Sequence, residues 1–202
     1  MIRQWRSLRK EAVLLVILLG ALQACSGFPR IVVLHDPLTP QEHVTLGESY
    51  QAQSNTELAV RDFQAALHQQ SDYVPALIAL GNLSFEAGTL QEAEDYYRRA
   101  LDAVPHQPAA SNNLAMVYLS RGDRLDDAER LAKDALAQRG ALRPYILDTL
   151  AKIYMRQERW QEARTALEEA VTAAPLENKL LHERLAQSQR ELTVAFPAST
   201  KP

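Results

Sequence analysis

The sequence repeats itself with a period of about 34 residues, and this recurrence constrains the fold more than any other feature. A leucine followed by a small residue recurs at intervals of 34, 34 and 36 residues, at Leu46-Gly47, Leu80-Gly81, Leu114-Ala115 and Leu150-Ala151. Alanines recur in the same way at Ala59, Ala93, Ala128 and Ala163, and again seven residues later at Ala66, Ala100, Ala135 and Ala170. A chain with such a period folds as similar units that bury their apolar faces against one another.

One period, residues 80–105, is typical of two helices joined by a turn. Gly88 interrupts the apolar spacing of the first helix, and Pro105 ends the second. Between them, Thr89 and Glu92 have the spacing of a capping box, which opens the second helix. The buried stripe of that helix is predicted to be Ala93, Tyr97, Ala100 and Leu101. The recurrent Gly and Ala allow the two helices to approach closely, because a larger side chain would hold them apart.

This pattern resembles the tetratricopeptide repeat, a helix–turn–helix unit of about 34 residues. The resemblance implies an all-α fold, an α-solenoid of about four repeats with helix pairs near 40–70, 73–104, 108–138 and 144–174. The alternative, a generic amphipathic helical bundle, also uses Ala and Leu but has no reason to keep such a period. A final helix after Pro175 is predicted to cap the stack through an apolar face of Leu180, Leu181, Leu185 and Leu192.

Four segments are expected along the chain: a signal peptide at 1–24, a lipidated N-terminus and tether at 25–38, the repeat domain at 39–193 and a disordered tail at 194–202. Thr39 and Glu42 form a second predicted capping box, which opens the first helix of the repeat domain. In the tether, the apolar run at 31–34 is expected to be extended and to pack against the first repeat. The alternative for this run is a strand offered to a partner by edge addition.

The beginning of the chain is typical of an export signal, with basic residues followed by an apolar run at 12–22. A membrane-spanning anchor is the weaker interpretation, because crossing a bilayer requires about 20 residues. Residues 22–25, Leu-Gln-Ala-Cys, resemble a bacterial lipobox. The resemblance implies that Cys25 becomes the mature N-terminus and carries several acyl chains, which anchor stably. Ser26 follows rather than Asp, and by the same resemblance this favours the outer membrane, facing the periplasm. The alternative is that Cys25 is an incidental thiol.

Charge and composition argue against nucleic-acid binding and catalysis. The chain has 22 basic and 25 acidic side chains, and removing residues 1–24, with four basic and one acidic, leaves 18 and 24. This acidic chain has no electrostatic footprint for nucleic acid. The five histidines show no ligand spacing, and the sequence contains no glycine-rich phosphate loop. We therefore expect no enzyme activity, no cofactor, no metal and no small-molecule substrate.

By resemblance to the repeat family, the first helix of each pair lines a concave groove that holds a peptide or a helix of a partner. The candidate groove residues are Ile78, Asn82, Phe85, Asn112, Met116, Leu119, Asp148, Lys152 and Met155. Phe and Met give adaptable apolar contact, and asparagines can hydrogen-bond an extended backbone. The pattern lacks the lysines with which some family members grip a C-terminal carboxylate. The alternative is that these side chains pack between repeats or against the terminal helix.

These features together predict a lipid-anchored, periplasmic scaffold or adaptor that binds a protein or peptide partner in the cell envelope. The chain resembles the small repeat lipoproteins that support assembly of type IV pili, outer-membrane proteins or exported polysaccharide. The alternative is a non-catalytic helper subunit of an envelope enzyme, such as an exported papain-like peptidase or a glycan synthase. A third interpretation is a purely structural role, such as spacing the outer membrane from the cell wall.

Overall fold

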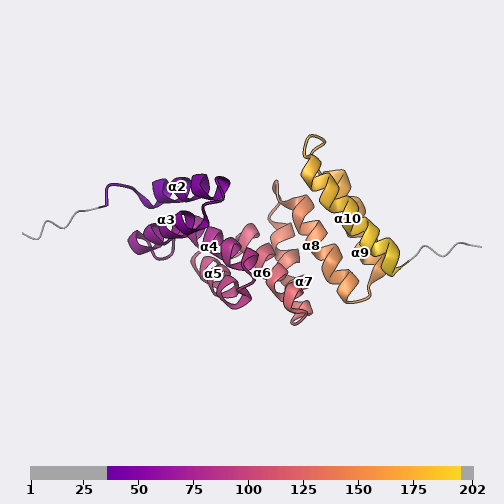
Figure 1. Cartoon of the computed structure of the whole chain (residues 1–202). Helices are drawn as coiled ribbons and strands as arrows, with labels where there is room; N and C mark the ends of the chain where they lie inside the picture. Colours follow the sequence, from indigo (N-terminus) through magenta and orange to yellow (C-terminus); the bar gives the residue numbers. More distant parts are fainter. Residues whose placement is uncertain (1–35, 197–202) are drawn as a thin grey trace, which may run out of the picture. The chain divides into compact units, whose positions relative to one another are not determined.

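All regular structure among residues 36–196, the part of the chain described by the computed structural model, is helical. The helices are α2 (Pro40–Ala52), α3 (Thr56–Gln69), α4 (Val74–Glu86), α5 (Leu90–Ala103), α6 (Pro108–Arg121), α7 (Leu125–Ala137), α8 (Arg143–Arg156), α9 (Trp160–Ala173) and α10 (Lys179–Ala195), shown in Figure 1. No strand occurs within these residues, so the all-α prediction is confirmed. The predicted signal peptide, Cys25 and the apolar run at 31–34 lie outside them, as do residues 197–202.

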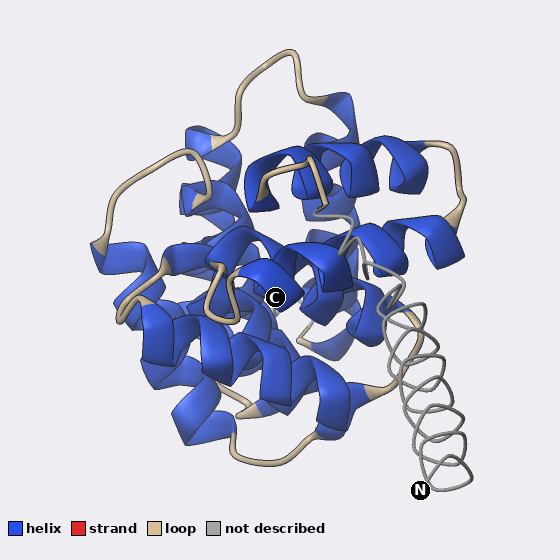
Figure 2. Ribbon diagram, turned by 90° about the vertical axis from the view of Figure 1, so that its left-hand side faces the viewer, coloured by secondary structure: helices blue, strands red, loops and turns tan. Residues whose placement is uncertain are grey.

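The first eight of these helices form four pairs, each joined by a turn of three residues. The second helix of each pair packs against the first helix of the next pair, so the repeats stack in chain order (Figure 1). Figure 2 shows the described residues as helices joined by loops. The observed bounds agree with the predicted pairs to within one residue. The predicted solenoid of four repeats is therefore confirmed.

The recurrent small residues lie where the two helices of a repeat meet. Ala59, Ala93, Ala128 and Ala163 are all fully buried. A Cβ atom added to Gly81 of α4 would lie 2.5 Å from the ring of Tyr97 on α5. Gly47 of α2 approaches the ring of Phe63 on α3 equally closely. Each glycine thus leaves room for the aromatic ring opposite it, and any side chain there would displace the ring.

Of the two predicted capping boxes, only the first is formed. The Glu42 amide donates to the Thr39 hydroxyl (3.3 Å), and the Thr39 amide donates to the Glu42 carboxylate (2.7 Å). The hydrogen bonds that the Glu42 carboxylate accepts from the Thr39 amide and the Thr39 hydroxyl lower the pKa of Glu42. Thr89 does precede α5, but its hydroxyl donates to the Ser84 carbonyl (3.0 Å) and to Glu92 (3.2 Å) rather than accepting from the helix. The prediction at Thr89 was wrong because both its amide (2.9 Å) and its hydroxyl donate back to the Ser84 carbonyl at the end of α4.

Helix α10 covers the last repeat, packing against α8 and α9 as predicted for a cap. Its buried face consists of Leu181, Leu185, Ser188 and Leu192, whereas Leu180 is 78% exposed. Including Leu180 in the apolar face was therefore wrong: it lies one residue, about 100° of helix, away from the stripe. The boundary at 193 was also too early, because α10 continues to Ala195 and Phe196 stacks on Trp160 with ring centroids 5.9 Å apart.

Candidate partner-binding groove

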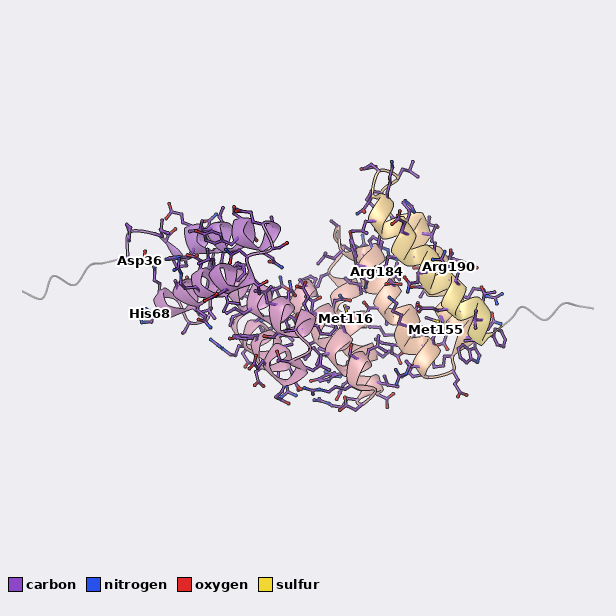
Figure 3. The ribbon with its side chains drawn as sticks, viewed as in Figure 1. Asp36, His68, Met116, Met155, Arg184 and Arg190 are labelled. Atoms are coloured by element: carbon purple, nitrogen blue, oxygen red, sulfur yellow. The ribbon has the colours of Figure 1, made fainter. Side chains whose placement is uncertain are left out.

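The predicted groove residues come together best between α4 and α6, the first helices of the second and third repeats. A pocket of about 100 Å³ lies there, lined by Asn82, Phe85, Glu86, Tyr97, Asn113 and Met116. Three of these six residues were predicted from the sequence. The next helix of the series, α8, carries Met155, and Figure 3 labels Met116 and Met155 on the two helices. The pocket offers apolar and amide groups side by side.

Asn82 is held in place by two neighbours. Its side-chain oxygen accepts hydrogen bonds from the Tyr97 hydroxyl (2.8 Å) and from the Asn113 side-chain amide (2.8 Å). Burial raises the pKa of Tyr97, so this hydroxyl stays protonated and remains a donor. With the oxygen doubly occupied, the orientation of the Asn82 amide is determined, and its nitrogen has no partner among residues 36–196. The groove thus carries one pre-oriented hydrogen-bond donor.

The amide network continues from Asn113 to Asn112, which donates to the Asn113 oxygen (3.3 Å). Asn112 is nearly buried, and its own oxygen has no hydrogen-bond partner. Sequence reasoning assigned Asn112 to the groove but did not foresee that Asn113 and Tyr97 hold Asn82. The sequence did give a signal for Tyr97, since it belongs to the predicted buried stripe of its helix. The structure places its ring opposite Gly81, which directly precedes Asn82 in the chain.

The apolar candidates are only partly exposed. Phe85, Leu119 and Met155 are half-buried and pack against the largest core cluster, and Ile78 packs against a smaller one that contains Leu77. Each therefore has one side in the inter-repeat contacts and another at the surface. Such anchoring reduces the side-chain freedom that a partner would have to freeze on binding.

Asp148 does not line the groove, contrary to the prediction. It is fully buried and accepts hydrogen bonds from Ser188 (2.6 Å), Arg184 (2.7 Å) and Lys152 (3.0 Å). Burial opposes ionisation of Asp148, but the Ser188 hydrogen bond and the two cations outweigh it, so its pKa is lowered. The reason for the error is that α10 packs over α8 at the position that faces the groove in earlier repeats.

Lys152 is committed to the same cluster through its ion pair with Asp148. Arg184 extends from α10 toward α8 in Figure 3. The polar candidates of the fourth repeat therefore secure the C-terminal cap, and the amide-lined part of the groove is confined to α4 and α6.

The described part of the chain shows neither a metal cluster nor a membrane-spanning helix. Within residues 36–196, no three His, Cys, Asp or Glu side chains are grouped so that they could hold a metal ion. Over the same residues, no helix combines the length and the apolar character needed to cross a bilayer.

Sequence models described as "Tetratricopeptide repeat" match residues 44–108, 84–141 and 144–176. Together they span most of the stacked repeats. The chain belongs to the tetratricopeptide repeat family, as the sequence pattern predicted. Repeats of this family bind protein partners, so the chain is a protein of the interaction-scaffold class.

Curated relatives match over part of their length. The human protein O-mannosyl-transferase TMTC1 is 28% identical over 69% of this chain and 16% of its own length. The Photosystem I assembly protein Ycf3 of Synechococcus elongatus is 33% identical over 41% of this chain and 49% of its own length. The chain thus spans about half of Ycf3 and a much smaller share of the other relative.

Solved structures support the fold. The chain matches pilF of Pseudomonas aeruginosa with a TM-score of 0.61 and 18% identity, over 81% of this chain and 79% of that one. MamA matches with a TM-score of 0.57 and 18% identity, over 73% and 81%. At such identities the likeness shows a shared helical-repeat fold and nothing further.

Proposed function

We propose that the protein is a lipid-anchored scaffold that binds a protein partner through the groove between α4 and α6. The observation that carries this proposal is the pre-oriented Asn82 amide beside the half-buried Phe85 and Met116 in one open pocket. A partner segment in extended conformation would accept a hydrogen bond from Asn82 with a backbone carbonyl. It would place an apolar side chain against the Phe85 ring and the Met116 thioether.

The groove is suited to recognition with a small entropic cost. Asn82 is fixed before the partner arrives, and Phe85 already packs against the core. A donor that is already oriented loses little freedom when it binds. Met116 is flexible and polarisable, so it can adapt to apolar side chains of different shape. Binding by these groups requires no chemistry, which agrees with a scaffold.

A direct test compares partner recovery by two variants with the same charge change. Met116→Lys replaces the apolar thioether of the groove pocket by a cation, and Gln138→Lys places a cation on an exposed site outside the pocket. Tagged protein is isolated from solubilised membranes, and the co-isolated partner is quantified by mass spectrometry. We expect Met116→Lys to reduce recovery at least about tenfold, a loss of about 1.4 kcal/mol. Equal recovery with both variants would exclude the groove as the interface.

The second part of the proposal is the anchor at Cys25, with the protein facing the periplasm from the outer membrane. Its support is the sequence of residues 22–25 and the basic, then apolar, segment before it. We expect Cys25→Ala to abolish acylation, measured by incorporation of radiolabelled palmitate, and to release the protein from the outer-membrane fraction. Cys25→Ala protein that still incorporates palmitate would refute the anchor.

The pathway that this scaffold serves is the assembly of a cell-envelope complex, such as a pilus, the outer-membrane machinery or the polysaccharide machinery. One similar protein supports an assembly role: Ycf3 is named as a Photosystem I assembly protein. The isolation experiment described above would identify the partner and hence the pathway.

A further inference from the structure

A cluster of charged and aromatic side chains fills the contact between the second and third repeats. The buried carboxylate of Glu94 on α5 forms ion pairs with Arg98 (2.7 Å) and Arg121, and it accepts a hydrogen bond from the Tyr118 hydroxyl (3.1 Å). The guanidinium of Arg124, which precedes α7, lies 4.2 Å from the centre of the Tyr118 ring. Tyr118 therefore contacts a guanidinium group with its ring and a carboxylate with its hydroxyl.

The same arrangement recurs between the third and fourth repeats. Glu129 pairs with Lys133 (2.6 Å) and with Arg159 (2.5 Å), and the Arg159 guanidinium lies 4.4 Å from the centre of the Tyr154 ring. These four residues are 35 or 36 positions after Glu94, Arg98, Tyr118 and Arg124 in the same order. Both of these contacts between repeats therefore contain the same four groups: a carboxylate, a cation, a tyrosine ring and a second cation.

The contact between the first and second repeats lacks all four groups. At the equivalent positions stand Val60, Gln64, Ser84 and Thr89. All four line a pocket of about 250 Å³, whose walls include Leu80 and Leu83. An apolar cavity of about 150 Å³ is large enough to hold benzene. The first contact therefore contains a hollow large enough for an aromatic ring, at the place where the later contacts supply their own tyrosine.

The rim of this hollow carries a carboxylate that lacks a cation. In the later contacts the corresponding acids, Asp127 and Glu162, pair with Arg124 and Arg159. In the first contact the corresponding acid is Glu92, and Thr89 replaces the arginine. The hydroxyl of Thr89 donates to Glu92 at 3.2 Å, and no ion pair joins Glu92 to another of the described residues. The hollow thus lacks the tyrosine and the arginine of the later contacts, and the only aromatic residue among those that line it is Tyr96.

We propose that this hollow is a second binding site, which takes an aromatic side chain of a partner protein with an adjacent arginine. The ring would lie between Leu80, Leu83 and Val60, and the guanidinium would pair with Glu92, as Arg124 pairs with Asp127. The site is separate from the groove, because α4 directs Ser84 into the hollow and Asn82 and Phe85 into the groove pocket.

The test titrates the full-length, isotope-labelled chain with the peptide acetyl-Tyr-Arg-amide and follows the backbone amide signals of Val60, Ser84 and Thr89 by NMR. We expect saturable shifts of these signals. Acetyl-Tyr-Glu-amide, which places a carboxylate beside Glu92, should bind at least about fivefold more weakly. Ser84→Tyr, which supplies the ring found in the later repeats, should weaken acetyl-Tyr-Arg-amide binding at least about tenfold. Phe85→Ala, in the groove, should leave binding within about twofold of the original.

A second variant keeps the test decisive if Ser84→Tyr does not fold. Glu92→Gln should weaken acetyl-Tyr-Arg-amide at least about threefold and should not weaken acetyl-Tyr-Glu-amide. Absence of shifts at the three amides would overturn the proposal, as would shifts that both Ser84→Tyr and Glu92→Gln leave unchanged. Shifts that grow with protein concentration in the absence of peptide would identify a second copy of the chain as the occupant, and would also overturn it.

Discussion

Replacing Gly81 by Ala tests the packing that both builds the repeat and positions the groove. The added Cβ would lie 2.5, 2.8 and 2.9 Å from three atoms of the Tyr97 ring, closer than carbon atoms approach in proteins. Tyr97 is fully buried and its hydroxyl is bound to Asn82, so the ring has little room to withdraw. Overpacking of a core costs about 1–3 kcal/mol. Ala has a better helix propensity than Gly, and this stabilises the variant by about 1 kcal/mol.

We therefore expect Gly81→Ala to lower the free energy of unfolding by up to about 2 kcal/mol. For a domain of this size that corresponds to a fall in Tm of up to about 8 °C. The assay is urea unfolding followed by circular dichroism. Gly140→Ala is the matched control, because a Cβ at Gly140 meets no atom within 4 Å and its backbone is not left-handed. The control should leave stability unchanged or raise it by up to about 1 kcal/mol.

A double-mutant cycle identifies the cause. Tyr97→Leu removes the ring that the new Cβ would overlap, so Gly81→Ala should cost less in that background than alone. Stability that rises equally in Gly81→Ala and Gly140→Ala would refute the reasoning. The same result would mean that the approach of α4 to α5 does not depend on the small residue.

Two further predictions concern the C-terminal cap. Because the folded-state pKa of Asp148 is lowered below its ordinary value of 3.8, its ionised form stabilises the fold above that value, and this contribution is lost as the pH falls through the folded-state pKa. Asp148→Asn should therefore lower the free energy of unfolding at pH 7, toward the lower end of about 3–5 kcal/mol, and should flatten the decline of that free energy between neutral and acidic pH. The assay is urea unfolding across this pH range, with the exposed Asp102→Asn as control. Parallel pH profiles for the two variants would contradict the prediction. Leu181→Ala should lower the free energy of unfolding by about 2–5 kcal/mol, and Leu180→Ala by less than about 0.5 kcal/mol. Equal melting temperatures for the two variants would mean that the register of α10 is wrong.

The period of the sequence was sufficient to predict the repeat fold. A Gly or Ala recurring at the same place reports a close approach of two helices, and the rings opposite Gly47 and Gly81 show that this approach is real. Helix ends also followed from local signals, since Pro, Gly and capping residues act through their immediate neighbours. For these reasons the four pairs were predicted to within one residue.

The errors arose where distant segments determine the outcome. Asp148 had the position of a groove residue, but its burial depends on Arg184 and Ser188 in a helix more than thirty residues later. The apolar face of α10 was ambiguous because Leu180 and Leu181 are adjacent. In the observed register of α10, Leu181 is buried and the polar Ser188 donates a hydrogen bond to Asp148.

The groove was predicted in part for a similar reason. Family resemblance placed Asn82, Phe85 and Met116 on the first helices, and the structure brings them to one pocket. It could not show that Tyr97 and Asn113 orient Asn82, because those hydrogen bonds join three different helices. The side chains that orient a binding group were therefore harder to predict than the group itself.

The central claim is that a protein partner occupies the groove between α4 and α6, and photo-crosslinking in intact cells tests it most directly. A photoreactive amino acid is placed at Phe85 or Met116 in the groove, with exposed Glu169 on α9 as the outer-face control. Crosslinked products are identified by mass spectrometry. The account predicts that one envelope protein is captured from both groove positions and not from Glu169. Capture from Glu169 alone, or from none of the three positions, would contradict it.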